Sequence, residues 1–247
     1  MKKIIGLIPA AGKGSRLGLP FPKELYPVVA GNSVVPVAAY AMSQIDEVTN
    51  RCVVVITPDK HQLMEYYSKC TWIESAVRYV VQGNGTDLAD AVRWAYPAIR
   101  GKRVAFAMPD TIIWPEWAMA ELDQQMTDED DMVMGLFVVS DPSKFGMVST
   151  WNGYATGVYD KQPASVIPYA WGCLLWQPKF TEMVWQSRDS FAELLNEIVQ
   201  QGHTKVVEFD KPDHHYYDLG TVDGIKEYLS DKYALSKTEV NKCVTKS

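Results

Sequence analysis

The order of short apolar runs along the chain limits the folds that this sequence can adopt. The runs are rich in β-branched residues, as expected for strands that helices cover on both faces. Segments with helical periodicity stand between them, so the pattern is that of an α/β protein with a mainly parallel sheet. The expected strands are 4–8, 53–57, 77–81 and 104–108, and the expected helices are 36–44 and 86–96.

The pattern changes after the apolar segment 132–139. Turn residues then separate short segments, which we expect to add mixed or antiparallel strands at 147–150, 155–159 and 169–175. A helix follows at 190–201, where Ser190 and Glu193 form a capping box and Gly202 ends the helical pattern. No repeat or linker interrupts the sequence. We therefore expect one domain over residues 1–247, with a polar tail from about residue 235.

Charge and composition limit the partners of the chain. The net charge of −6 does not suit broad binding of nucleic acid, although a local group of cations can still hold a small polyanion. The longest apolar runs, such as 52–56, are far too short to cross a membrane. We therefore expect small-molecule partners, with no nucleic acid and no membrane. The cysteines lie far apart without metal-binding spacing, which predicts free thiols in a reducing cytoplasm. They are Cys52, Cys70, Cys173 and Cys243.

The loop after the first expected strand has the chemistry of a phosphate site. Gly12 and Gly14 let the backbone turn tightly and present its N–H groups to a ligand. Lys13, Arg16 and Lys23 add positive charge to the same loop, at the carboxyl edge of a parallel sheet. Together these features predict a triphosphate-binding site.

Two better-known phosphate loops do not match this segment. A dinucleotide fingerprint, Gly-x-Gly-x-x-Gly, requires a third glycine where the chain has Leu17. A P-loop, Gly-x-x-x-x-Gly-Lys-[Ser/Thr], requires its two glycines five positions apart, but Gly6 lies one residue too far from Gly12. It also requires a hydroxyl residue at the position of Gly14. The spacing therefore argues against both loops and against a nicotinamide-dependent dehydrogenase.

The string Gly12-x-Gly14-x-Arg16, followed by Pro22-Lys23, resembles the signature of the sugar-phosphate nucleotidylyltransferases, which include the glucose-1-phosphate thymidylyltransferases. This resemblance implies a Rossmann-like three-layer α/β fold with a mixed, mainly parallel central sheet, of the nucleotide-diphospho-sugar transferase type. It also implies a Mg²⁺-dependent reaction. In that reaction a nucleoside triphosphate and a sugar 1-phosphate give a nucleotide sugar and pyrophosphate.

Two aspartates stand where the resembled family binds its metal ion. Asp110 follows an expected strand, with Pro109 where the family usually has glycine, and Asp218 precedes Gly220-Thr221 ahead of a helix. Either aspartate, taken alone, is more typical of a turn or a helix cap than of a metal site. The resemblance implies that Asp110 and Asp218 together hold Mg²⁺, which proteins commonly bind through one or two carboxylates and phosphate oxygens.

The segment from Gln82 through Thr86 resembles the base-recognition loop of the family. Gln82 offers an amide edge that can pair with a pyrimidine, and Gly85 leaves room for the ring. Thr86 also suits the N-cap of the helix that follows, and this alternative stays open.

Two further glycines resemble elements of the sugar pocket. Gly146 lies in Lys-Phe-Gly-Met-Val, a string similar to one that the family places beside the sugar. Gly172 follows Trp171 in a segment that the family lays against the sugar. Either Trp171 or Gly172 can line the pocket, and Trp171 suits the core equally well.

Asp160 and Lys161 stand where the family commonly has Glu-Lys-Pro. In that motif the acid contacts the sugar and the lysine contacts its phosphate, so the resemblance implies these roles here. The chain has aspartate in place of glutamate and an inserted Gln162, which leaves the role of Asp160 open.

The implied reaction is an in-line displacement in which positioning and charge neutralisation supply most of the catalysis. We assign Arg16 and Lys23 to the triphosphate, Lys161 to the sugar phosphate and Asp110 to the metal ion. Other residues of the first loop are expected to face the nucleotide. They are Ala10, Ala11, Gly12 and Gly14.

Two alternatives within the same fold stay open. A glycosyltransferase would consume the nucleotide sugar, but it usually has an Asp-x-Asp motif, which the sequence lacks at Asp110. A non-catalytic nucleotide sensor would not need both metal aspartates.

The adjacent His214 and His215 point to opposite faces of an extended segment, so we expect no transition-metal site there. The base, the sugar and a homo-oligomer with tryptophans at its interface stay open at this point.

Overall fold

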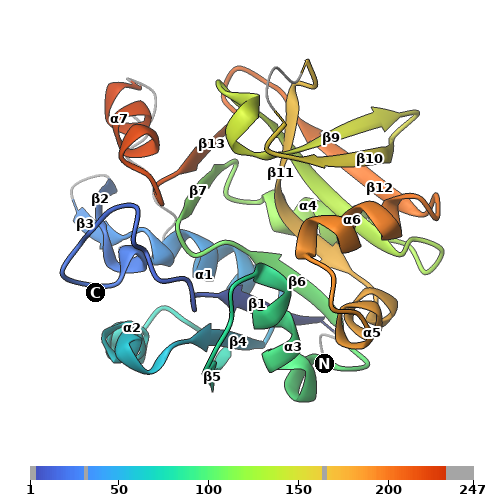
Figure 1. Ribbon diagram of the computed structural model, residues 1–247. Coiled ribbons are helices and arrows are strands. Elements are labelled where there is room, and N and C mark those ends of the chain that lie inside the picture. Colours follow the sequence, from blue (N-terminus) through green and yellow to red (C-terminus); the bar gives the residue numbers. More distant parts are fainter. Residues whose placement is uncertain (1–3, 31–32, 163–165, 232–247) are drawn as a thin grey trace.

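The computed structural model describes residues 4–30, 33–162 and 166–231, and the predicted polar tail lies outside these residues. A mixed sheet runs through the middle of the molecule with helices on both faces (Figure 1). Its strands are β1 (Ile4–Pro9), β4 (Arg51–Ile56), β5 (Ala76–Val81), β6 (Arg103–Ala107), β8 (Met132–Val138), β9 (Gly146–Trp151), β10 (Tyr154–Asp160), β11 (Tyr169–Trp176) and β12 (Thr204–Phe209). They are arranged in the order β5-β4-β1-β6-β11-β8-β12-β10-β9.

Smaller elements surround this sheet. Two antiparallel pairs are formed by β2 (Pro27–Ala30) with β3 (Ser33–Pro36), and by β7 (Thr111–Trp114) with β13 (His215–Asp218). The α-helices are α1 (Ala38–Val48), α2 (His61–Lys69), α3 (Leu88–Ile99), α4 (Ala118–Gln125), α5 (Pro178–Gln186), α6 (Phe191–Val199) and α7 (Val222–Ser230). Short 3₁₀ turns are η1 (Lys23–Leu25), η2 (Pro58–Lys60) and η3 (Pro142–Lys144). Within the described part of the chain, no helix combines the length and the apolar character that crossing a membrane requires.

The two halves of the sheet differ in strand direction. Strands β5, β4, β1 and β6 are parallel, whereas β11 runs antiparallel to both β6 and β8. Strands β9 and β10 are also antiparallel, as expected for the C-terminal half, whereas β12 runs parallel to β8. The sheet is therefore mixed, with its run of parallel strands in the N-terminal half. Between β9 and β10, Asn152 and Gly153 have φ angles of 49° and 80°. Positive angles at both positions form a two-residue hairpin, which can only join antiparallel strands.

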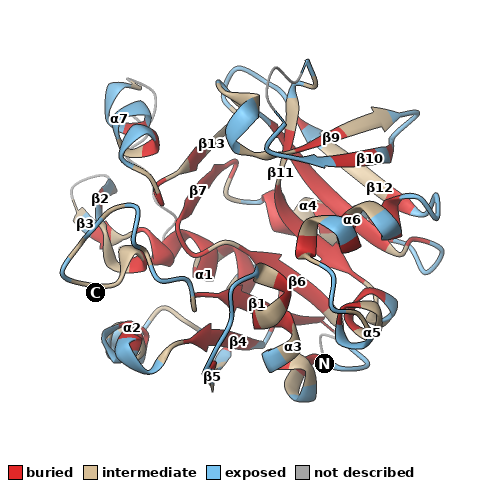
Figure 2. Ribbon diagram, viewed as in Figure 1, coloured by how far each residue is buried: buried red, intermediate tan, exposed pale blue. Residues whose placement is uncertain are grey.

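Both faces of the central strands are buried, which explains their continuous apolar runs. Along β1, Ile5 and Leu7 pack into the core beneath α3, α5 and α6. Ile4 and Ile8 point the other way and pack beneath α1, α2 and α4, as alternation along a strand requires. Figure 2 shows the central strands of the sheet buried, its outer strands β5, β9, β10 and β12 partly exposed, and the outward faces of the helices exposed. The predicted α/β class, with helices on both sides of the sheet, is confirmed.

Two predicted helices can be compared in detail with the structure. Helix α6 has the predicted capping box, in which Ser190 and Glu193 each accept a backbone N–H from the other's residue. Helix α3 begins two residues later than expected, because Asp87 rather than Thr86 is its N-cap. The sequence pattern predicted no helix at α2, α4 or α5, whereas α7 follows Thr221, where a helix was expected.

Candidate active site

The short β7–β13 ladder brings two distant aspartates together. Asp218 pairs with Thr111 in this ladder, and the Leu219 N–H donates a hydrogen bond to the Asp110 carbonyl at 2.9 Å. Both carboxylates face the space above Gly220. A Cβ placed on this glycine would lie 2.5 Å from Asp110 Oδ2 and 2.9 Å from Asp218 Oδ1. Because glycine has no side chain, Gly220 keeps the space between the two carboxylates open.

The alternative role of Asp218 as a turn or cap residue accounts for one of its contacts. Its Oδ1 accepts a hydrogen bond from the Gly220 N–H at 2.8 Å, as in a turn. The helix cap, however, is Thr221, whose hydroxyl accepts from the Gly224 N–H at the start of α7. The turn bond fixes one oxygen of Asp218 and orients the carboxylate toward Asp110.

The pair of aspartates carries an excess of negative charge. Burial and the neighbouring Asp110 carboxylate raise the pKa of Asp218 above its usual value. Lys23 donates a hydrogen bond to Asp110 Oδ2 and forms an ion pair with it. Burial lowers the pKa of Lys23, but Asp110 and Glu24 raise it more, so this lysine stays charged. One lysine facing two carboxylates leaves net negative charge at the centre of the cleft.

The phosphate-loop residues line the same cleft. Gly14 has a φ angle of 64°, which favours glycine, and the side chain of Lys23 passes 3.6 Å from where its Cβ would be. Lys13 and Arg16 are exposed to solvent. The charge of Arg16 acts on Asp218 by lowering its pKa, against the larger effect of burial. The structure therefore places Lys23 and Arg16 beside the carboxylate pair, whereas Lys13 lines the part of the cleft next to Gly12.

A buried ion pair that the sequence did not reveal supports this loop from below. Lys60 Nζ donates to Glu24 Oε1 and to the Ala10 carbonyl, both at 2.6 Å. The two side chains are 3% and 0% exposed. Lys60 thus connects the start of the loop at Ala10 to Glu24, next to Lys23. No local pattern marks Lys60, because it lies in an ordinary polar turn 36 residues after Glu24.

The base-recognition segment follows β5. Gln82 is 4% exposed, and its Oε1 has no hydrogen-bond partner among the described residues. Its side chain fills the space beside Gly85, where a Cβ would collide with the Gln82 amide. Gly85 therefore makes room for Gln82 itself. Asp87 and Asp90 form the capping box of α3, and the Thr86 N–H, one residue before the N-cap, also donates to Asp90 Oδ2 at 2.9 Å.

Most of the residues predicted for the sugar pocket line the cleft, and Gly172 does not. Lys161 has a φ angle of 46°, and its backbone N–H donates to the Phe145 carbonyl at 3.0 Å. Its Nζ stands 3.9 Å from Asp160 Oδ2. Gly146 packs against Trp171, which lines the cleft. Gly172 instead packs against Phe137 and Tyr216 in the core, so of the two candidates Trp171 faces the cleft. A register shift in β11 between residues 171 and 173 accompanies this arrangement.

These residues line two connected cavities. The larger, of about 460 Å³, is called the nucleotide cavity here, and the smaller, of about 230 Å³, the acceptor cavity. Lys23, Asp87, Leu88 and Met108 line both. The nucleotide cavity is also lined by Pro9, Ala11, Gly12, Lys13, Gln82, Gly85, Thr86 and Ala91. The acceptor cavity is also lined by Arg16, Asp110, Thr111, Lys144, Phe145, Gly146, Asp160, Lys161, Trp171, Phe191, Ala192, Tyr216 and Asp218.

The two histidines lie outside these cavities. His215 stacks on Tyr217, and His214 packs edge-on against Trp117 and Phe209. Among the described residues, no group of three or more His, Cys, Asp or Glu side chains could hold a metal ion. The aspartate pair would therefore bind a cation only with oxygens from another source.

The fold and this charged cleft define a Rossmann-like α/β protein whose site lies at the carboxyl ends of its parallel strands. A family model described as nucleotidyl transferase matches residues 5–233. The match spans most of the chain, and the chain belongs to the nucleotidyl transferase family. The family prediction made from the sequence is confirmed.

Two curated relatives are bifunctional GlmU proteins. The chain is 30% identical to that of Rhodopseudomonas palustris over 161 residues, which cover 64% of this chain and 34% of the relative. It is 29% identical to that of Parvibaculum lavamentivorans over 143 residues, which cover 57% of this chain and 30% of the relative. The matched stretch is about a third of the length of these relatives.

Solved structures share the fold over nearly the whole chain. A protein described as a glucose-1-phosphate thymidylyltransferase from Bacillus anthracis, in complex with sucrose, superposes with a TM-score of 0.80 at 17% identity. That likeness covers 96% of both chains. A UDP-glucose pyrophosphorylase complexed with UDP-glucose gives a TM-score of 0.76 at 19% identity, over 90% of this chain and 96% of the other.

Proposed function

We propose that this protein is a sugar-1-phosphate nucleotidylyltransferase, which joins a nucleoside triphosphate to a sugar 1-phosphate and releases pyrophosphate. The observation that carries the proposal is the position of Lys23, which lines both cavities and forms an ion pair with Asp110 in the acceptor cavity. Two anionic substrates can therefore approach each other across one cluster of charges. The names of the structural neighbours, a thymidylyltransferase and a pyrophosphorylase, support the same reaction.

The reaction needs no protein nucleophile, because the acceptor phosphate is already anionic. One of its oxygens attacks the α-phosphorus and forms a new P–O bond. The bond from the α-phosphorus to the bridging oxygen breaks, and its electron pair leaves with pyrophosphate. Arg16 and Lys23 would neutralise charge on the triphosphate, and Lys161 would bind the attacking phosphate. Catalysis then comes from positioning and from reduced repulsion between two anions.

The aspartate pair fits a magnesium ion. Asp110 and Asp218 offer hard oxygen donors that face one space, and Gly220 leaves that space open. Phosphate oxygens and water would complete the coordination, as is usual for Mg²⁺ at phosphoryl sites. When bound, the ion would neutralise charge on the phosphate oxygens of the substrates.

The buried amide of Gln82 supports recognition of a nucleobase. An amide oxygen that is buried without a partner costs stability unless a ligand or water satisfies it. Gln82 lines the nucleotide cavity, so the N–H edge of a base such as a pyrimidine can supply this partner. We also propose a cytoplasmic location. It is supported by Cys52, Cys70 and Cys173, which are free thiols in the structure.

The test is pyrophosphate release in the presence of Mg²⁺, with four nucleoside triphosphates each combined with a panel of sugar 1-phosphates. We expect release that requires one triphosphate and one sugar phosphate together and that stops when the metal is chelated. Hydrolysis or transfer of a nucleotide sugar, without its synthesis, would favour a glycosyltransferase. Nucleotide binding without any turnover would favour a sensor.

A further inference from the structure

Helix α3 closes the nucleotide cavity with its first residues. Its capping box joins the base-recognition segment to the helix, since Asp87 Oδ1 accepts from the Ala89 N–H at 2.8 Å. Asp90 Oδ2 accepts from the Thr86 and Asp87 N–H groups at 2.9 and 3.2 Å. Although burial alone would raise the pKa of Asp90, these N–H groups and Arg93 hold it below its usual value. The capping carboxylate is therefore firmly ionised and fixed.

The same Asp87 oxygen also holds the start of another helix. Asp87 Oδ1 accepts from the Phe191 N–H at 2.8 Å, a contact between residues 104 positions apart. Phe191 is the first residue of α6, so one carboxylate serves the amino ends of two helices, where the helix dipoles favour negative charge. Phe191 and Ala192 form one wall of the acceptor cavity.

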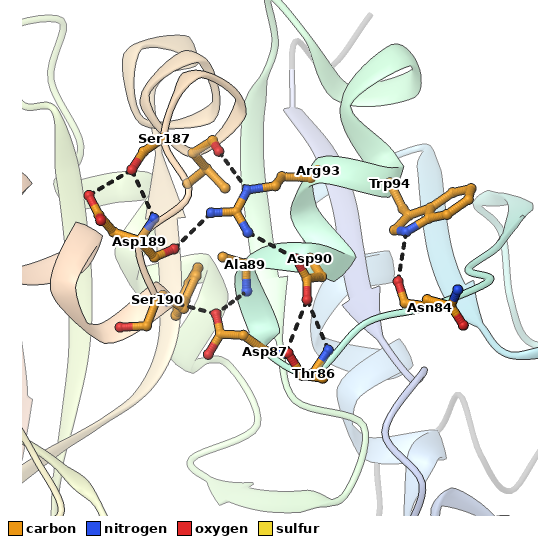
Figure 3. Close-up of polar contacts among 12 residues, drawn as sticks. Asn84, Thr86, Asp87, Ala89, Asp90, Arg93, Trp94, Ser187, Asp189 and Ser190 are labelled. Atoms are coloured by element: carbon orange, nitrogen blue, oxygen red, sulfur yellow. Dashed lines mark hydrogen bonds and ion pairs between the residues drawn. The ribbon is translucent and has the colours of Figure 1, made fainter.

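Arg93 on α3 makes a second connection, to α5 and to the segment just before α6 (Figure 3). Its Nη1 donates to Asp90 Oδ1 at 2.9 Å, its Nη2 to the Asp189 carbonyl at 2.7 Å, and its Nε to the Val184 carbonyl at 3.0 Å. The side chain is 10% exposed, and all three of its nitrogen atoms donate a hydrogen bond. A planar guanidinium suits such a fixed set of acceptors, whereas an ammonium group would reach fewer of them.

The segment that Arg93 contacts is itself well ordered by local bonds. Ser187 Oγ and Asp189 exchange two hydrogen bonds, at 2.7 and 3.0 Å, ahead of the Ser190 cap of α6. Arg93 lines neither cavity. It therefore acts on the substrates only through the parts of the structure that it holds together.

We propose that Arg93 is a positioning residue that fixes the Phe191–Ala192 wall of the acceptor cavity onto the helix that closes the nucleotide cavity. This inference rests on the proposed function, because it assigns the wall to the sugar phosphate. We call the hydrogen bonds of Arg93 to Asp90, Val184 and Asp189 the bridge. The bridge holds the acceptor at a set distance from the nucleotide, which in-line attack requires. A displacement of about 1 Å between reacting groups can cost a hundredfold in rate.

The first experiment separates the two substrates by steady-state kinetics. In Arg93→Met we expect the KM for the acceptor phosphate to rise about tenfold, the size of effect expected from the loss of one charge-assisted hydrogen bond. The KM for the triphosphate should change less than about twofold. Arg93→Lys should give an intermediate value, because one ammonium group replaces part of the contact. Equal changes in both KM values, or no change in either, would overturn the proposal.

Arg103→Met is the matched control. Arg103 donates to Gln177 Oε1 at 3.2 Å, so it holds the opposite end of α5 from the one that Arg93 contacts, and it lines neither cavity. We expect this variant to lose stability without a difference between the two KM values. A selective rise in acceptor KM in Arg103→Met as well would show a general loosening of α5 and would overturn the specific role of Arg93.

A second measurement does not depend on turnover. Amide hydrogen exchange of residues 189–192 should become about tenfold faster in Arg93→Met and stay unchanged in Arg103→Met. The reason is that Arg93 holds the Asp189 carbonyl, two residues before the Phe191 N–H that donates to Asp87. If the wild-type protein releases no pyrophosphate with any substrate pair, the proposed function fails, and this exchange difference still decides whether the bridge holds the wall. Equal exchange in wild type and Arg93→Met would overturn it.

Discussion

The nucleotide half of the cleft and its acceptor half hold their charged residues in different ways. In the nucleotide half, Lys60 and Glu24 form an ion pair that is almost fully buried beneath the phosphate loop, and Lys23, at the boundary between the two halves, bonds to the buried Asp110. In the acceptor half, Lys161 and Asp160 are 65% and 49% exposed and stand 3.9 Å apart. The nucleotide half is thus preorganised before any substrate binds, whereas the acceptor half keeps charged side chains free to adjust.

This difference teaches where specificity and stability reside. Removing either partner of a buried ion pair lowers the stability of the fold, because the remaining charge is left buried without its counter-charge. An exposed pair contributes little to folding and is available for a ligand. We therefore expect substitutions in the nucleotide half to affect folding and turnover, and those in the acceptor half to affect one substrate constant.

The largest effect is expected for Lys60→Met. Removing Lys60 leaves Glu24 buried without its cation, which we expect to lower the free energy of unfolding by about 3–5 kcal/mol at neutral pH. Burial already raises the pKa of Glu24, and the loss of Lys60 raises it further. A raised carboxyl pKa means that the folded state favours the protonated form. The loss of stability should therefore shrink as the pH falls through that pKa, and urea unfolding at pH 8 and pH 5 measures the difference.

Two further variants control this prediction. The double variant Glu24→Gln with Lys60→Met removes both charges and should regain part of the lost stability. Lys69→Met breaks the exposed pair with Glu65 and should leave unfolding unchanged. A pH-independent loss in Lys60→Met would show that the ionised Glu24 is not its cause.

Turnover should fall most in Asp110→Asn. We expect pyrophosphate release to drop by about 10²–10³-fold, the usual effect of removing one group that stabilises transition-state charge. The unfolding transition should stay in place, because the substitution also removes the repulsion between Asp110 and Asp218, and Lys23 keeps the charge of Asp218 beside it. Asp123→Asn on α4 is the control and should keep full activity. Wild-type rates in Asp110→Asn at saturating Mg²⁺ would remove Asp110 from the site.

The residues of the nucleotide half were easier to predict from the sequence. Gly12, Gly14 and Lys23 lie within one short segment directly after a strand, so a local string is enough to identify them. Asp110 and Asp218 were found by resemblance. Their approach depends on the β7–β13 register, which two strands of four residues cannot encode in a recognisable pattern.

The remaining contacts have no local signal. Glu24 bonds to a lysine 36 residues away, and Arg93 bonds to the carbonyl of a residue 96 positions away. Such contacts depend on how helices pack against the sheet, which periodicity does not determine. The choice between Trp171 and Gly172 depends in the same way on the register of strand β11, which shifts beside Gly172 where Trp171 lines the cleft.

Lys161→Met tests the acceptor half of the comparison. We expect kcat/KM for the sugar phosphate to fall about 10–100-fold, since a charge-assisted hydrogen bond contributes about 1.5–3 kcal/mol. The KM for the triphosphate and the unfolding transition should stay unchanged, because Lys161 is largely exposed. Lys179→Met removes another half-exposed lysine, paired with Asp131, and should leave both constants unchanged. A rise in the KM for the triphosphate alone would move Lys161 to the nucleotide.

The smallest effect is expected for Gln82→Leu, which also sharpens the comparison most. Leucine fills a similar volume but removes the amide, so kcat/KM for the preferred triphosphate should fall about 2–10-fold, the value of one neutral hydrogen bond. Discrimination among the four triphosphates should fall with it. Stability should not decrease, because the substitution removes a buried oxygen that has no partner within the described part of the chain.

Gln44 offers a matched control for Gln82, since it is equally buried at 4% exposure and its Oε1 likewise has no partner among the described residues. It lies on α1, outside both cavities. Gln44→Leu should therefore remove the same kind of unsatisfied oxygen without changing discrimination among the triphosphates. If Gln82→Leu also leaves discrimination unchanged, the buried amide has no role in recognising the base. The preorganisation of the nucleotide half would then extend to its phosphate loop alone.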